Sequence, residues 1–159
     1  MAVHSMKDMP AECAAGLTFA KAWKREDCRD VLILKTAGSF LELPSGAVIG
    51  TGSLRRACQL AMLRPDIQFT AIRGNVDTRI NKLMDDSYGL DGIVLAAAGL
   101  NRLGRSSEIT EYLDPEVVIP APAQGVLAIE TAEVNTELLD KINALSDDNS
   151  DRELSLIHI

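Results

Sequence analysis

Short apolar runs alternate with segments of helical periodicity along this chain. Apolar runs bounded by turn-forming or charged residues predict strands at residues 2–4, 17–22, 31–34, 47–50, 67–72 and 92–97. Apolar positions recur at helical spacing in residues 54–63, 76–84 and 136–145. Ser53 is a suitable N-cap for the first of these helices, and Pro65 ends it.

The order strand, helix, strand, helix, strand predicts an α/β fold, doubly wound, with a largely parallel sheet. Residues 24–30 hold six charges in seven positions and are typical of a boundary between two lobes. Residues 146–151 are acidic and predict a loop or the start of a disordered end. No internal repeat and no low-complexity tract interrupts this pattern.

Three predicted turns carry the candidate chemistry, at residues 5–10, 50–56 and 72–79. Ligands of open α/β sheets bind beyond the carboxyl ends of strands, where free N–H groups and the helix dipole favour anions. Arg55 and Arg56 add permanently charged forks suited to carboxylates, and Arg73 and Arg79 bracket the next helix start. Any one of these arginines alone is more typical of a solvated helix face, but several at such turns indicate an anion pocket. No Lys-Ser/Thr pair follows Gly52, so a P-loop is not indicated.

Asp8 is a carboxylate in a site otherwise built to hold anions. Its simplest interpretation is a surface ion pair with Lys7, which contributes little. The functional interpretation is a carboxylate kept ionised by arginines, which stabilises a cation or passes a proton to a leaving amine. His4 is more typical of a structural histidine, and Cys28 has no His or Asn partner pattern for nucleophilic chemistry.

Composition and charge narrow the function classes. The net charge of −7 is a C-terminal feature, because residues 130–159 hold 8 acids and 2 bases whereas residues 1–129 hold 15 and 14. A nucleic-acid binder is therefore not indicated. The sequence has no apolar run of membrane-spanning length and no signal-peptide pattern, which predicts a cytoplasmic protein without membrane attachment. Three cysteines without CxxC spacing indicate neither a disulfide framework nor a zinc site.

Five segments, in sequence order, resemble motifs of the porphobilinogen deaminase (hydroxymethylbilane synthase) family. His-Ser-Met-Lys-Asp at 4–8 resembles the active-site aspartate segment of that family. Residues 50–56 resemble its Thr-Ser-Ser-Leu-Arg-Arg segment, with Gly52 in place of a serine, and residues 73–79 resemble its Arg-Gly-Asn segment. Residues 97–104 and 120–130 resemble two later segments, so the resemblance covers residues 1 to about 153.

The resemblance implies two doubly wound lobes like those of type II periplasmic binding proteins, with the site in the cleft between them. It implies a transferase that joins four porphobilinogen units head to tail with loss of ammonia, without a metal and as a monomer when full length. Asp8 is then the catalytic carboxylate, and porphobilinogen is the small-molecule partner. A dipyrromethane cofactor is implied, with its side chains held by Ser5, Lys7, Ser53, Arg55, Arg56 and Arg79. The incoming substrate is expected at Arg73, Arg79 and Arg102.

The resemblance also implies a division of the chain that is truncated at both ends. Residues 1–25 are expected to end domain 1, residues 26–117 to form domain 2, residues 118–135 to return to domain 1, and residues 136–153 to begin domain 3. Residues 154–159 do not continue the family pattern and are expected to be a non-native tail. The family attaches its cofactor to a cysteine in a Gly-Cys-x-x-Pro-type context, which Cys13, Cys28 and Cys58 lack. We therefore expect this chain alone to be inactive.

Two alternatives stay open at this point. The first is a non-enzymatic module of the same two-lobed fold that binds small anions, which needs the arginines but not Asp8. The second is a cysteine-dependent enzyme that uses Cys28. Replacement of Asp8 distinguishes the first alternative from the deaminase, and sensitivity to alkylation distinguishes the second.

Overall fold

A computed structural model of the chain describes residues 1–10, 13–36 and 38–155. The chain forms two compact units, which we describe separately. Unit 1 comprises Met1–Cys28 and Ala121–Ile159, and unit 2 comprises Arg29–Pro120. The chain therefore crosses between the units twice, after Cys28 and after Pro120. None of the helices in the described ranges combines the length and the apolar character that a membrane span requires.

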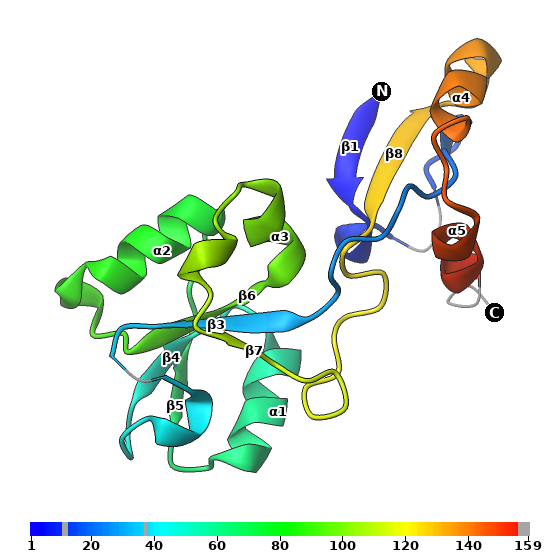
Figure 1. The fold of residues 1–159 in the computed structure, drawn as a ribbon. Helices are drawn as coiled ribbons and strands as arrows, with labels where there is room; N and C mark the ends of the chain where they lie inside the picture. The colour runs from blue at the N-terminus through cyan, green and yellow to red at the C-terminus, as the bar shows by residue number, and fades with distance from the viewer. Residues whose placement is uncertain (11–12, 37, 156–159) are drawn as a thin grey trace. The chain divides into compact units, whose positions relative to one another are not determined.

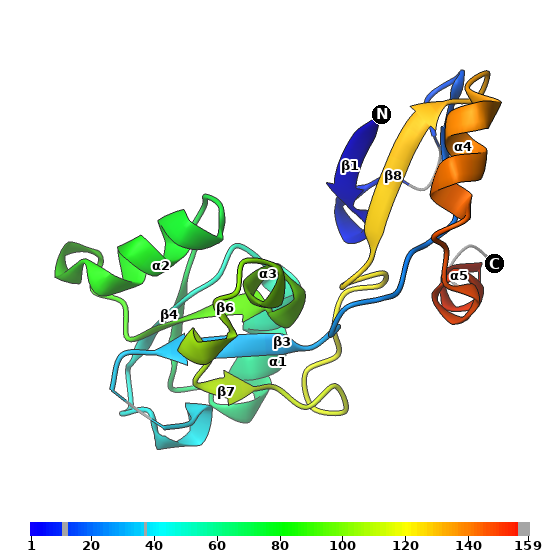
Figure 2. The same ribbon diagram turned by 45° about the horizontal axis from the view of Figure 1, so that its top comes forward.

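Unit 2 is built on a mixed five-stranded sheet (Figures 1 and 2). Its strand order is β5-β4-β6-β3-β7, with β4 parallel to β5 and β6, and with β3 antiparallel to β6 and β7. The bounds of these strands are Asp30–Leu34 (β3), Val48–Gly50 (β4), Gln68–Thr70 (β5), Gly92–Ala96 (β6) and Glu111–Tyr112 (β7).

Helices cover both faces of this sheet because its central strands alternate apolar side chains between the two faces. Leu32 and Leu34 of β3 pack in one core cluster with Leu60 of α1. Val31 and Ile33 pack in a second cluster with residues of α2 and α3. Figures 1 and 2 accordingly show α1 on one side of the sheet and α2 and α3 on the other. The helices are Leu54–Leu63 (α1), Val76–Met84 (α2) and Ala97–Arg102 (α3), with 3-10 turns at Phe40–Glu42 (η2), Asp86–Tyr88 (η3) and Ser106–Glu108 (η4).

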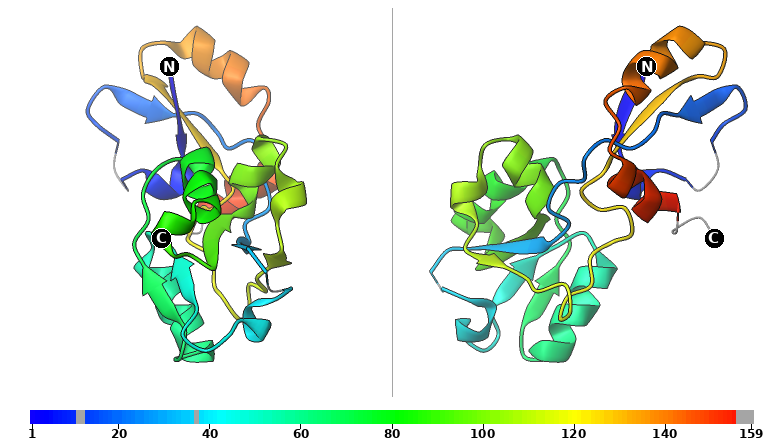
Figure 3. Two further views of the ribbon diagram at one scale, coloured as in Figure 1. Left: turned by 90° about the vertical axis from the view of Figure 1, so that its left-hand side faces the viewer. Right: turned by 45° about the vertical axis from the view of Figure 1, so that its right-hand side comes forward.

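Unit 1 is smaller and is built on a three-stranded antiparallel sheet (Figure 3). The central strand β8 (Leu127–Ala132) pairs with β1 (Ala2–Ser5) on one edge and with β2 (Leu17–Phe19) on the other. The strand β1 leads directly into the 3-10 turn η1 (Met6–Asp8), and α4 (Thr136–Asn143) and α5 (Asp148–Ser155) follow β8. In this unit Ala22, Ala123, Val126 and Leu154 form a small cluster of buried residues, and Ala128, Ile129 and Ile142 are buried besides.

The predicted α/β class is confirmed, but the sheets are mixed rather than largely parallel. Only the pairs β4–β5 and β4–β6 are parallel among the described strands. The described residues of the connection from β3 to β4 contain no long crossover helix, and antiparallel strands do not require one. The predicted bounds of α1 and α2 are confirmed to the residue.

The prediction of a loop or disordered end at residues 146–151 is wrong, because α5 begins at Asp148. The carboxylate of Asp147 accepts hydrogen bonds from the Ser150 amide (2.9 Å) and hydroxyl (2.7 Å), which fixes the first turn of this helix. Leu154 at its end is buried in the core of unit 1. The predicted non-native tail lies, for residues 156–159, outside the described residues. The assignment of residues 136–153 to a third domain stays a prediction.

Candidate functional site

Three strands of unit 2 end at the same edge of its sheet. Because β4, β5 and β6 are parallel, their carboxyl ends lie together, and they lead into α1, α2 and α3 respectively. Asp30 begins the antiparallel strand β3 and pairs with Ala96 at the end of β6, so it lies at this edge too. We call this region the carboxyl edge of unit 2. It is the place where α/β sheets bind ligands.

The turn from β4 to α1 is fixed by Thr51 rather than by Ser53. Thr51 is buried, its amide donates to the Thr70 carbonyl (2.9 Å), and its Oγ1 accepts a hydrogen bond from the Ser53 amide (3.2 Å). Ser53 occupies the predicted N-cap position, but its side chain makes no capping hydrogen bond in the described part of the chain. The Ser53 hydroxyl therefore does not cap the first-turn N–H groups of α1. N–H groups at a helix N-terminus can bind an anion.

Arg55 and Arg56 both bind the buried carboxylate of Asp30. Nη2 of Arg56 lies 2.7 Å from Oδ1 of Asp30, and Nε of Arg56 donates to the same oxygen at 2.9 Å. Nη2 of Arg55 lies 2.7 Å from the other oxygen, Oδ2. Asp30 is completely buried, and the side chain of Arg56 is only 6% exposed, whereas that of Arg55 is 26% exposed. The interpretation of Arg56 as a solvated surface residue is therefore wrong.

The second helix start at this edge carries Arg73 and Arg79. The side chain of Asn75 caps α2 by accepting a hydrogen bond from the Thr78 amide (2.8 Å). Gly74 precedes this cap at a φ of +124°, and a Cβ there would lie 2.6 Å from the Thr78 side chain, so the turn requires glycine. Nε of Arg79 donates back to the Gly74 carbonyl (2.8 Å), which keeps this half-buried arginine near the helix start. Arg73 is exposed.

Arg102 is placed differently from the other arginines. It is the last residue of the six-residue helix α3, whose first residue follows β6 directly. A rise of ~1.5 Å per residue puts it roughly 8 Å along the helix from the carboxyl edge. The structure thus gathers Ser53, Arg55, Arg56, Arg73 and Arg79 at one edge and places the exposed Arg102 at the far end of α3.

The other predicted site residues belong to unit 1. Ser5 ends β1, and Lys7 and Asp8 lie in the following turn η1, with Asp8 exposed and Lys7 half-buried. Nζ of Lys7 donates to Oε1 of Gln124 (3.0 Å). His4 lies on β1 with its Nε2 3.4 Å from Oε2 of Glu130, and its assignment as a structural histidine stays a prediction.

Gln124 ties Lys7 to both segments that connect the units. It is fully buried, and its Nε2 donates to the Cys28 carbonyl (2.7 Å). The carbonyl of Gln124 in turn accepts a hydrogen bond from Nε of Arg25 (2.9 Å). The side chain beside the candidate catalytic aspartate is thereby fixed to the chain just before its first crossing and just after its second.

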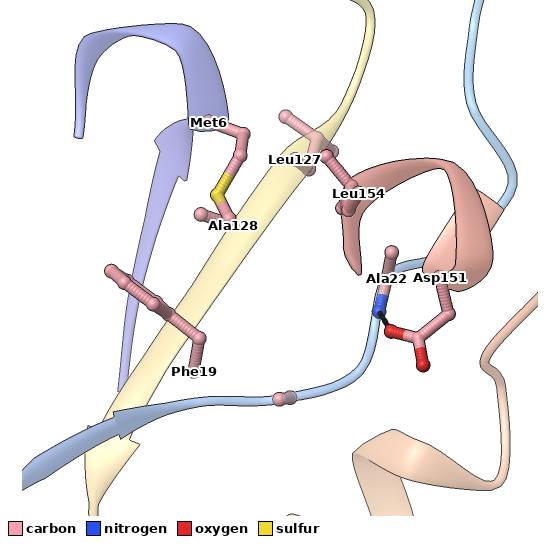
Figure 4. A pocket seen from close by; sticks show the side chains of 8 residues that line it. Met6, Phe19, Ala22, Leu127, Ala128, Asp151 and Leu154 are labelled. Atoms are coloured by element: carbon pink, nitrogen blue, oxygen red, sulfur yellow. Dashed lines mark hydrogen bonds between the residues drawn. The ribbon is translucent and has the colours of Figure 1, made fainter. Parts of the chain in front are cut away.

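An apolar hollow of about 220 Å³ in unit 1 is separate from these residues (Figure 4). Met6 lines it from η1, Phe19 lines it from β2, and Leu154 lines it from α5. Among the described lining residues the one charged side chain is that of Asp151, which already accepts a hydrogen bond from the Ala22 amide (3.1 Å). The hollow lacks the convergent polar groups of a specific ligand site. The described residues also contain no group of three or more His, Cys, Asp or Glu that could hold a metal ion.

Sequence reasoning missed Asp30 and Gln124. Asp30 had a usable signal, since it is a charged residue directly before the uniformly apolar run at 31–34. If the strand begins at residue 30, the carboxylate of Asp30 is buried together with the apolar run. A buried carboxylate needs a cationic partner, which the sequence could have indicated. Gln124 had no such signal, because it lies among the prolines and small residues of a turn-rich segment.

Comparison with known proteins identifies the family. Residues 1–140 match the family described as "Porphobilinogen deaminase, dipyromethane cofactor binding domain". The chain is 99% identical over 153 residues to porphobilinogen deaminase of Lachnospira eligens, which covers 96% of this chain and 52% of that protein. It is 52% identical over 152 residues to porphobilinogen deaminase of Clostridioides difficile, covering 95% of this chain and 50% of the relative. The chain thus spans about half the length of these relatives.

One solved structure supports the same fold class at low sequence identity. A putative lipoprotein from Actinomyces odontolyticus matches with a TM-score of 0.55 and 17% identity, covering 89% of this chain and 65% of that one. A periplasmic binding protein of Salmonella typhimurium matches with a TM-score of 0.46 and 17% identity, covering 87% and 63%. The first similarity agrees with the α/β architecture described above. By its sequence match over residues 1–140, the chain belongs to the porphobilinogen deaminase family.

Proposed function

We propose that this chain acts as part of a porphobilinogen deaminase, a transferase that condenses four porphobilinogen units head to tail to give hydroxymethylbilane. The observation that carries the proposal is the 99% identity over 153 residues to the Lachnospira eligens enzyme. Because the chain spans 52% of that relative, the activity is assigned to the longer protein of which these residues form a part.

Asp8 is the proposed catalytic carboxylate. In each addition, the C–N bond of the substrate's aminomethyl group breaks and ammonia leaves, which places positive charge on the substrate. A carboxylate near that charge stabilises it, and a carboxylate can also accept the proton lost when the new C–C bond between pyrroles forms. The exposure of Asp8 at the end of η1 supports this role, because the group is accessible to a ligand.

The residues of the carboxyl edge suit the dipyrromethane cofactor of the family. Two guanidinium groups against one carboxylate leave a surplus positive charge at Arg55, Arg56 and Asp30. The cofactor, when bound, supplies the pyrrole end to which new units are added. Its acetate and propionate groups are matched by bidentate guanidinium donors. We assign its binding to Ser5, Lys7, Ser53, Arg55, Arg56 and Arg79.

The incoming porphobilinogen also carries carboxylates, and we assign their binding to Arg73, Arg79 and Arg102. The exposure of Arg73 and Arg102 supports a role with a ligand that must enter and leave. The proposal further includes a cytoplasmic location and a monomeric full-length protein that binds neither nucleic acid nor membrane.

Replacement of Asp8 tests the proposal in a longer protein. This sequence is grafted in place of the matching 153 residues of the Lachnospira eligens relative, and hydroxymethylbilane formation from porphobilinogen is measured. We expect Asp8→Asn to lower kcat by at least about 100-fold, in line with the loss of an acid–base group, while porphobilinogen still binds. The matched control is Asp140→Asn, which alters an exposed aspartate of α4 and should leave kcat unchanged.

A second candidate, a non-enzymatic module that binds small anions, is favoured by one observation. The arginine pair and its carboxylate lie entirely within unit 2, whereas Asp8 lies in unit 1. Under this alternative, the grafted protein forms no hydroxymethylbilane, and Asp8→Asn leaves the affinity for carboxylate ligands unchanged. Those two results together would replace the deaminase proposal with the binding module.

A further inference from the structure

We propose that Asp30 is a positioning residue that holds Arg55 and Arg56 in the orientation that binds carboxylate ligands. This inference deepens the proposed function and rests on it for the identity of the ligand. Asp30 is not one of the residues that we assign to the cofactor or the substrate. The inference rests on three observations. Asp30 lies at the carboxyl edge, it is buried, and it pairs with two arginines.

The fold itself places Asp30 beneath the arginines. Asp30 is the first residue of β3, next to the central strand β6, and its partner Ala96 is the last residue of that strand. The amide of Ala97, the first residue of α3, donates to the carbonyl of Arg29, which precedes Asp30 (3.0 Å). The backbone around Asp30 is thus fixed on the side of β6 and α3, and its carboxylate is a rigid anchor.

Each carboxylate oxygen of Asp30 holds a different arginine. Oδ1 faces Nε and Nη2 of Arg56, and Oδ2 faces Nη2 of Arg55. Each guanidinium also donates through Nη1 to a backbone carbonyl, that of Val94 for Arg56 (3.2 Å) and that of Ile119 for Arg55. The hydrogen bonds of Arg56 to Asp30 and Val94 set the plane of its guanidinium, which is the property that bidentate recognition of a carboxylate requires. Arg55 is held by its hydrogen bond to the Ile119 carbonyl and by an ion pair with Oδ2 of Asp30 that lacks hydrogen-bond geometry.

The charge balance at this cluster is suited to an anion. A fully buried carboxylate is unfavourable unless it is paired, and Arg56 with its 6% exposed side chain neutralises Asp30 in the interior. The second positive charge is carried by Arg55, whose side chain is more exposed at 26%. Asp30 therefore holds two arginines close together that would otherwise repel each other, and the cluster keeps a net positive charge.

The first test measures how much cofactor the grafted longer protein carries. Asp30→Asn keeps the shape of the side chain but removes its charge, so both guanidinium groups lose their common anchor. Because Arg55 and Arg56 are assigned to the cofactor, we expect the fraction of the protein that carries the attached cofactor, measured by intact mass, to fall by roughly 10-fold or more, with a smaller change in KM for porphobilinogen. Asp30→Glu restores the charge and should recover part of the lost cofactor occupancy.

A matched control separates positioning from stability. Asp91→Asn removes a carboxylate at the opposite end of β6, where Oδ2 of Asp91 accepts a hydrogen bond from the Val48 amide (2.8 Å). Both variants are compared by thermal unfolding and by the fraction of protein that carries the cofactor. The inference is overturned if Asp91→Asn lowers this fraction as much as Asp30→Asn at a similar loss of stability, or if Asp30→Asn leaves it unchanged.

A double-mutant cycle covers the case in which Asp30→Asn fails to fold. Asp30→Glu, which keeps the charge, is then combined with Arg55→Gln. If Asp30 acts through Arg55, the effect of Asp30→Glu on the fraction of protein that carries the cofactor should shrink several-fold in the Arg55→Gln background. Equal effects in both backgrounds would contradict the proposal.

A spectroscopic readout separates this inference from the proposed function. Two-dimensional ¹H–¹⁵N spectra of this 159-residue chain report on arginine Nε–H groups. We expect the Nε–H of Arg56 to exchange slowly with solvent and to lose this protection in Asp30→Asn. If the grafted protein forms no hydroxymethylbilane but this signal behaves as expected, the proposed function fails while the positioning role of Asp30 stands. If the signal does not change, the positioning role fails.

Discussion

Gln124 illustrates how one buried side chain organises the residues around a candidate catalytic group. Its amide oxygen binds Lys7, which precedes Asp8, and its amide nitrogen binds the carbonyl of Cys28. In Gln124→Leu both hydrogen bonds are lost, which at about 1–3 kcal/mol for each buried group left without its bond predicts a clear loss of stability. The measurement is urea unfolding followed by the fluorescence of Trp23, the only tryptophan, which lies in unit 1.

Gln68→Leu serves as the control for this prediction. Gln68 is exposed on β5 in unit 2, and surface substitutions usually change stability by less than about 0.5 kcal/mol. An equal shift of the urea midpoint in both variants would contradict the role assigned to Gln124.

Gly125 is a residue whose backbone, rather than side chain, determines the structure. Its φ is +92°, and a Cβ at this position would lie 2.3 Å from the carbonyl oxygen of Glu26. Glu26 also donates its amide to the Gly125 carbonyl (3.1 Å), so the two connecting segments run in close contact here. Gly125→Ala adds both a strained φ and a steric clash with backbone. We expect it to cost well over the ~1–2 kcal/mol of a left-handed non-glycine residue.

The control for Gly125→Ala is Gly16→Ala in the same unit. Gly16 has a φ of +81°, but a Cβ there meets nothing within 4 Å, so this variant isolates the conformational cost. Urea unfolding monitored by Trp23 fluorescence compares the two variants. If they lose the same stability, the contact between Gly125 and Glu26 contributes nothing.

At the scale of elements, α1 and α2 begin in different ways, and this difference is testable. Asn75 caps α2 through its side chain, so Asn75→Ala should cost ~1 kcal/mol. Ser53 holds the N-cap position of α1 without a capping hydrogen bond, so Ser53→Ala should leave stability within about 0.5 kcal/mol. Thermal unfolding measures both, and a similar loss in the two variants would show that Ser53 is a structural cap rather than a group kept for a ligand.

The elements that sequence could predict are those specified by local signals. The helices α1 and α2 have polar cap residues and strong periodicity, and Pro65 follows α1, so their bounds were predicted to the residue. The two-residue strand β7 and the helix α5 depend on contacts with distant segments, such as the packing of Leu154 on Ala22. Strand direction is likewise not local, which is why the antiparallel course of β3 was not predicted.

The residues of the candidate site also fall into those that local sequence patterns predict and those that depend on distant contacts. Arginines at the turns after β4 and β5 could be predicted, because the ends of parallel strands are defined by short sequence patterns. That Arg56 points inward to Asp30 could not be predicted, because residues 30 and 56 meet only through the antiparallel pairing of β3 with β6. The sequence thus indicates which arginines lie at the candidate site, and the tertiary structure determines which of them are buried against Asp30.

At the scale of the whole molecule, the two units differ in how much apolar core they contain. Unit 2 holds both large clusters of buried residues, which pack on opposite faces of a five-stranded sheet. Among the described residues of unit 1, the buried cluster has four members, two of them alanines, and Ala128, Ile129 and Ile142 are buried besides, next to an apolar hollow. Because stability follows buried apolar area, unit 1 should unfold at a lower urea concentration than unit 2.

The chain offers a separate probe for each unit. Trp23 reports on unit 1, where its Nε1 donates to the Ile142 carbonyl (3.2 Å), and the two tyrosines, Tyr88 and Tyr112, lie in unit 2. We expect the Trp23 fluorescence transition at a lower urea concentration than the main loss of far-ultraviolet circular dichroism. Leu83→Ala, a buried position of α2, should cost ~2–5 kcal/mol and shift only the later transition. Coincident transitions that shift together in this variant would mean that the two units unfold as one cooperative body, held by the hydrogen bonds of their connecting segments.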